Sequence, residues 1–130
     1  MTASLYFVEL TVRDLVAAIA WYREVLGLRP VMREADSFAV LAAGTTRLAL
    51  KQGTPSPGGV LLAFEVADLD EWVRCLAERG VRLEDVIKTS HEGYRRARLR
   101  DADGYEVSVF EWINEHRDGA DAEAPVPSRE

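Results

Sequence analysis

A repeated strand-to-helix junction is the feature that most constrains the fold of this chain. The first copy is VRDL at residues 12–15, and the second is VADL at residues 66–69. In both copies an alternating apolar stretch ends, an aspartate follows, and an apolar pattern with helical spacing begins. Such an aspartate can accept hydrogen bonds from the free N–H groups of a first helical turn. The repeat therefore indicates two halves of similar structure.

The first half begins with a predicted strand whose side chains alternate between two faces. Tyr6, Val8, Leu10 and Val12 are expected on the buried face, with Phe7, Glu9 and Thr11 opposite. A helix follows and ends at Gly27, because glycine readily takes the left-handed conformation of a helix end. Pro30 then suits the approach to a further strand. Two more strands are expected, and we place them at residues 38–41 and 46–51.

The second half repeats this order after a segment rich in glycine and proline at residues 53–59, which we interpret as a linker. We expect a strand, a helix that ends at Gly80, a short edge strand and a final hairpin. The hairpin turn is DADG at residues 101–104. The predicted strands are residues 60–66, 86–89, 94–100 and 105–112.

These elements predict an α+β fold of two βαβββ modules. The modules would form a curved mixed sheet with a concave inner face and with the helices outside. We place one domain at residues 1–115, with modules at about 5–53 and 60–113. The composition of residues 116–130 is rich in Asp, Glu, Ala, Pro and Ser and has no apolar period, so a disordered tail is expected there.

Composition and charge limit the possible partners. The formal net charge is −6, which argues against nucleic acid or an anionic membrane surface as a partner. It is compatible with a cationic ligand, although solubility alone explains an acidic surface equally well. No apolar run is long enough to span a membrane, and no secretory signal is visible, so a cytoplasmic location is expected. The single cysteine, Cys75, leaves no internal disulfide.

Two stretches resemble a known family. They are ELTVRDLVAAIAWYREVLGL at residues 9–28 and RDADGYEVSVFEW at residues 100–112. Both resemble the vicinal oxygen chelate superfamily, which includes glyoxalase I, bleomycin-resistance proteins and extradiol dioxygenases. The resemblance implies paired βαβββ modules, and usually two chains that form two sites between them. A homodimer is therefore expected.

The resemblance also identifies the positions where metal-dependent members carry their ligands. These positions hold Phe7, Ala49, Leu61 and Ser108 here. Divalent zinc, nickel or iron needs imidazole, carboxylate or thiolate donors, which this set does not supply. We therefore expect no metal and no cofactor, as in the metal-free, bleomycin-resistance-like branch. A shift of the alignment by two residues would instead bring in Glu9 or Glu106.

Strand parity predicts an inner face with aromatic and charged side chains, which suits a sizeable polar ligand. Phe110 and Trp112 either stack on a ligand or cover the sheet edge or a dimer interface. Phe38 either contacts the ligand or packs in the core. The predicted ligand-binding residues are Phe7, Glu9, Phe38, Arg47, Glu65, Arg96, Arg98, Ser108, Phe110 and Trp112.

Two functions agree with these observations. The first is a metal-free binding protein that sequesters an antibiotic or a similar planar, partly cationic compound at a dimer interface. The alternative is an enzyme of the superfamily (lyase, isomerase or dioxygenase-like) that acts on a small metabolite with Glu9 or Glu65 as acid or base. The two glutamates could equally form ion pairs with Arg47, Arg96 or Arg98.

Overall fold

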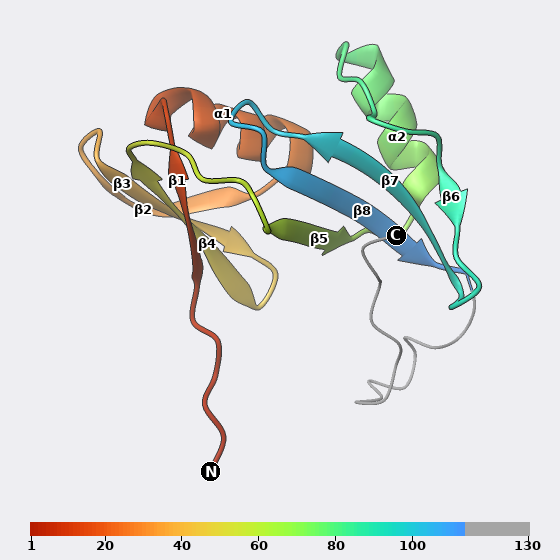
Figure 1. The fold of residues 1–130 in the computed structure, drawn as a ribbon, viewed down its shortest axis with the longest axis horizontal. Helices are drawn as coiled ribbons and strands as arrows, with labels where there is room; N and C mark the ends of the chain where they lie inside the picture. The colour runs from red at the N-terminus through yellow and green to blue at the C-terminus, as the bar shows by residue number, and fades with distance from the viewer. Residues whose placement is uncertain (114–130) are drawn as a thin grey trace. The chain divides into compact units, whose positions relative to one another are not determined.

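The computed structural model describes residues 1–113 of the chain (Figure 1). The expected disordered tail at residues 116–130 lies outside the described residues. The chain divides into two compact units. Within the described residues, the first comprises 1–58 together with 101–103, and the second comprises 59–100 and 104–113. The change from the first unit to the second after Gly58 falls within the segment rich in glycine and proline.

The first unit is a βαβββ module. Its elements are β1 (Val8–Val12), α1 (Leu15–Leu26), β2 (Arg29–Glu34), β3 (Phe38–Ala43) and β4 (Thr46–Gln52). The strands form one sheet in the order β1-β4-β3-β2. Strand β1 runs parallel to β4, and the other neighbouring pairs are antiparallel.

The second unit repeats this arrangement. It contains β5 (Leu61–Glu65), α2 (Leu69–Glu78), β6 (Lys88–Thr89), β7 (Tyr94–Arg100) and β8 (Glu106–Trp112). Its sheet has the order β5-β8-β7-β6, with β5 parallel to β8. The predicted α+β fold of two βαβββ modules is thus confirmed, with one four-stranded mixed sheet in each module.

The predicted aspartate caps begin both helices. Oδ1 of Asp14 accepts a hydrogen bond from the amide of Ala17 at 3.1 Å, and Oδ1 of Asp68 accepts one from Glu71 at 3.0 Å. Gly27 has φ 72°, so it provides the left-handed residue that ends α1. These side-chain acceptors satisfy amides that have no partner inside the helix.

A second side chain also accepts a hydrogen bond at each helix start. It comes from the last strand of the module, which runs parallel to the strand before the helix. Oε1 of Gln52, the last residue of β4, accepts from the amide of Leu15 at 2.7 Å. In the same way, Oε1 of Glu111 in β8 accepts from the amide of Leu69 at 2.6 Å. The first residue of each helix is therefore hydrogen-bonded to the far end of its module.

Each helix covers one face of its own sheet. In the first unit α1 packs on the face that carries Leu10, Leu48 and Leu50, all of which are buried. In the second unit α2 contacts β7 and β8, where Val107 and Val109 are fully buried. Because side chains alternate along a strand, the remaining positions of β1, β4, β7 and β8 lie on the faces away from the helices. No helix among residues 1–113 is long and apolar enough to cross a membrane.

The sequence prediction was wrong at the start of β1. The strand begins at Val8, and Tyr6 is 64% exposed rather than buried. Val8 is also exposed, so only Leu10 and Val12 form the buried face of this strand. The pairing with β4 begins at Val8 opposite Leu48, which leaves Tyr6 outside the sheet. The apolar alternation in the sequence extends upstream of Val8 to Tyr6, so it predicts a longer buried face for β1 than the structure has.

The turn at residues 101–103 closes the core of the first unit. The buried hydroxyl of Tyr22 in α1 donates to Oδ2 of Asp101 at 2.6 Å. The amide of Arg13 donates to Oδ1 of Asp103 at 3.0 Å. The turn that joins β7 to β8 thereby also provides acceptors for the helix and for the junction before it.

We expect Tyr22→Phe to lower the free energy of unfolding by about 1–3 kcal/mol, because the buried Asp101 carboxylate loses a donor. Urea denaturation measures this loss. Tyr6→Phe is the matched control, because the Tyr6 side chain is exposed, and it should change the value little. Equal stability of the two variants would show that the Tyr22 hydroxyl does not support the turn.

Candidate functional site

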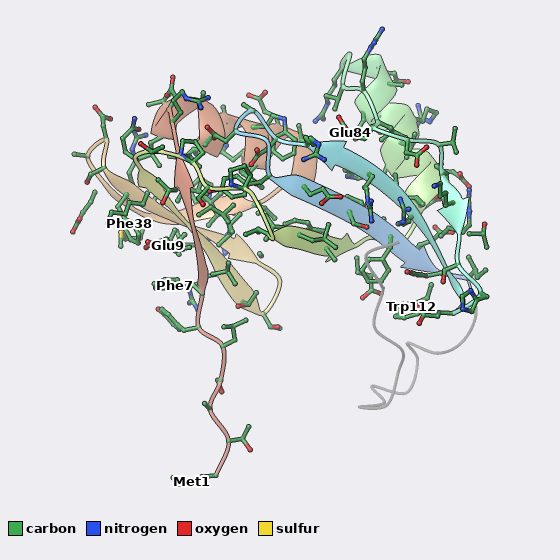
Figure 2. All side chains as sticks on the ribbon, viewed as in Figure 1. Met1, Phe7, Glu9, Phe38, Glu84 and Trp112 are labelled. Carbon is green, nitrogen blue, oxygen red and sulfur yellow. The ribbon has the colours of Figure 1, made fainter. Side chains whose placement is uncertain are left out.

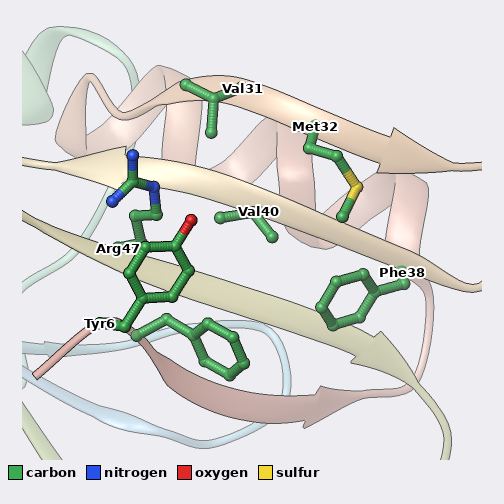
Figure 3. Close-up of a pocket in the computed structure, with 7 residues that line it drawn as sticks. Tyr6, Val31, Met32, Phe38, Val40 and Arg47 are labelled. Atoms are coloured by element: carbon green, nitrogen blue, oxygen red, sulfur yellow. The ribbon is translucent and has the colours of Figure 1, made fainter.

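A pocket of about 290 Å³ opens on the face of the first sheet that α1 does not cover (Figure 3). Side chains from β2, β3, β4 and the segment before β1 surround it. Most of them are aromatic or aliphatic, and one carries a charge. The lining residues are Tyr6, Phe7, Val31, Met32, Phe38, Val40 and Arg47.

The register of the sheet brings these residues together. Ala49 in β4 lies opposite Val40 in β3, which in turn lies opposite Met32 in β2. In the next row on this face Lys51 lies opposite Phe38. The register shifts between Pro30 and Met32. An irregularity of this kind re-aims side chains, and the consecutive residues Val31 and Met32 both line the pocket.

Arg47 lies at one end of the pocket and Phe38 lies at the other (Figure 3). The guanidinium carbon of Arg47 is 4.6 Å from the centroid of the Tyr6 ring, a cation–π contact. The Tyr6 and Phe7 rings are 5.8 Å apart and tilted by 57°. Within residues 1–113 the Arg47 side chain forms no ion pair. The Arg47 end of the pocket thus combines an aromatic wall with an available positive charge.

Glu9 lies on the same face of this sheet, beside Ala49 in the register. It is exposed, and its carboxylate has no ion-pair or hydrogen-bond partner in the described part of the chain. Figure 2 shows Glu9 together with Phe7 and Phe38 in the first unit. Glu9 does not line the pocket. It is a carboxylate on the pocket face that could meet a ligand extending beyond the lining.

Three of the predicted ligand-binding residues therefore meet in one pocket: Phe7, Phe38 and Arg47. The sequence prediction missed Tyr6, which it placed in the core. It also missed the β2 residues Val31 and Met32, because all six residues of β2 are exposed and show no alternating burial. The sequence does contain one indication of the Arg47 end of the pocket, because two aromatic residues, Tyr6 and Phe7, stand side by side just before a strand.

The other predicted residues lie on the second sheet, on the face away from α2. Arg98 lies opposite Ser108, and Arg96 lies opposite Phe110. Across the parallel pair, Phe110 lies opposite Glu65, which is exposed. Glu9 belongs to the first unit and Glu65 to the second, and a role of either as acid or base stays a prediction.

Phe110 and Trp112 belong to an aromatic cluster with Tyr94. Phe110 is 7% exposed and Tyr94 is 1% exposed. The Phe110 ring centroid is 5.6 Å from that of Trp112 and 5.9 Å from that of Tyr94. Ring pairs at these separations contribute packing energy beyond the area that they bury. This geometry favours the interpretation in which the two residues pack on the sheet.

Ion pairs engage several charges of the second unit. Arg98 pairs with Glu106 at 3.2 Å on the face away from α2. On the helix side Arg95 pairs with Asp70 of α2 at 3.0 Å. The hydrogen bond from Arg95 lowers the pKa of the Asp70 carboxyl. Arg95 therefore ties β7 to α2 and has no part in a site on the opposite face.

The four positions that the sequence resemblance assigns to metal ligands do not hold a donor set that fits a metal ion. Phe7, Ala49 and Leu61 have no donor atom, and Ser108 offers only a hydroxyl. In the described range 1–113, no three His, Cys, Asp or Glu side chains gather as metal ligands. Of the two acidic alternatives, Glu106 is already paired with Arg98, and Glu9 is exposed.

The sequence of residues 4–109 matches the Glyoxalase/Bleomycin resistance protein/Dioxygenase superfamily. The chain belongs to this family. Its fold and the family assignment agree, since solved structures of family members have the same architecture. No curated protein matches the chain in sequence.

Three similar solved structures illustrate the range of the fold. Lactoylglutathione lyase from Agrobacterium tumefaciens is 24% identical, with a TM-score of 0.73 over 85% of this chain and 95% of that protein. A family enzyme from Burkholderia phytofirmans PsJN is 21% identical, with a TM-score of 0.74 over 85% and 99%. TioX from Micromonospora sp. ML1 is 21% identical, with a TM-score of 0.71 over 85% and 99%. At these identities the likeness concerns the fold alone.

We expect Trp112→Ala to lower the free energy of unfolding by about 2 kcal/mol, because the ring contacts of Trp112 with Phe110 and with Tyr94 are lost. Denaturant unfolding measures the change. Phe7→Ala, which removes an aromatic ring from the pocket, should cost much less. An unchanged stability of Trp112→Ala would restore ligand stacking as the better interpretation of this residue.

Proposed function

We propose that this protein binds a planar, largely apolar small molecule in the pocket of the first unit and acts by sequestering it. The observation that carries the proposal is the lining itself: three aromatic rings and three aliphatic side chains around about 290 Å³. Ligand sites in proteins combine such apolar walls with few polar groups that fix orientation. An antibiotic or a similar planar compound has the matching shape and surface.

Binding would proceed without a metal ion. The family's ligand positions in the first unit hold Phe7 and Ala49, and a phenyl ring and a methyl group cannot coordinate a cation. Phe7 instead adds a ring to the pocket lining. The same position thus supports stacking where metal-dependent relatives place a metal ligand.

The charged residues of this face suggest a ligand with a basic group. Glu9 offers a carboxylate without a partner in the described chain, and the whole chain carries a net charge of −6. The positive charge of Arg47 would repel a cationic group bound at the Arg47 end of the pocket. We therefore propose that the aromatic plane of the ligand contacts Phe38 and that its basic group points toward Glu9. We further propose that the protein acts as a homodimer in the cytoplasm.

We expect Phe38→Ala to weaken the binding of planar aromatic compounds about fivefold, since one stacking contact contributes about 1 kcal/mol. Isothermal titration in the presence of EDTA measures the affinity. Val16→Ala, at an exposed position of α1, is the control and should bind normally. Binding that appears only after a divalent metal is added would contradict the proposal.

Glu9 supports a second candidate function, because an exposed carboxylate on the pocket face could act as an acid or a base in an enzyme. Glu9→Gln separates the two functions. In a binding protein it should weaken a cationic ligand about three- to tenfold and leave a neutral analogue of the same shape unaffected.

Chromatography of the bound compound after incubation provides the decisive measurement. The sequestration proposal expects the compound to be recovered unchanged from the wild-type protein. Conversion by the wild type that is lost in Glu9→Gln, with binding of the neutral analogue intact, would establish the enzyme instead.

A further inference from the structure

Of the seven residues that line the pocket of the first unit within the described chain, Arg47 alone carries a charge (Figure 3). Its side chain is half-buried. Among residues 1–113 no ion pair and no hydrogen bond engages its guanidinium. A partly desolvated cation without a partner gains from a ligand that supplies acceptor oxygens. Arg47 is therefore the group in this pocket that can discriminate between ligands by charge.

The Tyr6 ring restrains the Arg47 side chain from one side. The ring centroid lies 4.6 Å from the guanidinium carbon. The hydroxyl of Thr46 donates toward the carbonyl oxygens of Leu5 and Tyr6, each at 3.4 Å, and so ties the segment before β1 to β4. The contact with the ring provides no oxygen acceptor, so the N–H donors of the guanidinium stay available. Because the side chain is already held in place, binding an acceptor there costs less rotamer freedom.

A second arginine lies in the same row of the sheet. Arg47 in β4 lies opposite Ala42 in β3, and Ala42 lies opposite Arg29 in β2. Residues directly opposite each other project to the same face, so both arginines belong to the pocket face. The three paired residues of this row include no carboxylate. Arg29 does not line the pocket, but its charge adds to the positive potential at the Arg47 end.

The carboxylates of this face lie further along the strands. Glu34 and Lys51 both lie opposite Phe38, so their charges offset each other at that end of the pocket. Glu9 lies one row further along than Arg47 and forms no ion pair with it in the described chain. An exposed pair of these two would contribute little free energy, so it would not keep a ligand away from Arg47. The positions of the charges, more than their sum, therefore make the Arg47 end cationic.

We propose that the planar ligand of this pocket is an aromatic acid whose carboxylate pairs with Arg47. The inference rests on the proposed function, because it concerns the ligand of the same pocket. A carboxylate is planar and offers two oxygens to the fork of N–H donors on a guanidinium. The aromatic part of the ligand then extends along the apolar lining toward Phe38. With a basic group directed at Glu9, the complete ligand is an amphoteric aromatic acid.

Two probes of equal shape, 2-naphthoate and 2-naphthamide, test the inference on the full-length protein. Isothermal titration near neutral pH, with EDTA and little salt, measures both affinities. We expect 2-naphthoate to bind about tenfold more tightly, because its hydrogen bonds to Arg47 are charge-assisted. Added sodium chloride should reduce this preference. Equal or tighter binding of 2-naphthamide would overturn the inference and leave the proposed function standing. If neither probe binds, the proposed function fails, and the inference fails with it.

Arg47→Met shows whether the preference comes from this side chain. It keeps the apolar stem but removes the charge, so 2-naphthoate should bind about tenfold more weakly. The affinity for 2-naphthamide should stay within about twofold, which also shows that the variant pocket is intact. Lys51→Met is the matched control, because it removes a positive charge from the same strand and face. An equal loss of 2-naphthoate binding in both variants, or a parallel loss of 2-naphthamide binding in Arg47→Met, would contradict a pairing of the carboxylate with Arg47.

Discussion

Both modules depend on a hydrogen bond between the first helical residue and a side chain from a strand that comes much later in the module. In the first unit the acceptor is Gln52, and in the second it is Glu111. Each bond holds the start of a helix next to the end of the last strand of its module. That strand runs parallel to the first strand, which precedes the helix. The sheet order therefore follows from this junction, because it holds the first and last strands of the module side by side. The faces away from the helices are then set by side-chain alternation alone.

The sequence predicts what local chemistry determines. Asp14, Asp68 and Gly27 act as expected because a cap or a left-handed residue depends on a few neighbouring atoms. The hairpin of β7 and β8 follows equally from its turn. Phe7 and Phe38 could be assigned to the pocket face by parity, since the period of a strand is strict.

The remaining features depend on contacts that the sequence does not display. All residues of β2 are exposed, so this strand shows no alternation of buried and exposed side chains. Tyr6 continues the alternation of β1 but lies beyond the pairing with β4, and its ring contacts Arg47 instead. The placement of Val31 in the pocket accompanies a register shift, which only the paired strand reveals. The bonds to Gln52 and Glu111 join residues far apart in the chain, and a local pattern cannot show them.

The two modules share a fold but offer different surfaces. Ala49 and Ser108 lie on the central strands β4 and β8, each on the face away from the helix. Aromatic and aliphatic side chains line the pocket beside the first, whereas arginines, carboxylates and aromatic rings share the face around the second. The repeated backbone thus carries an apolar pocket in one copy and a mixed, charged face in the other. Fold-level similarity to other family members cannot supply this distinction, because it resides in side chains.

The turn at residues 101–103 makes the first module dependent on a late part of the chain. Tyr22 is buried against Asp101, so the helix of the first module meets its acceptor only when the chain has been extended through most of the second. During synthesis on the ribosome, the first half would therefore emerge before the acceptor of Tyr22 has been made. Its folding could not be completed until Asp101 follows. The first unit is therefore complete only after residues 101–103 have been synthesised, although the rest of it, residues 1–58, comes first in the chain.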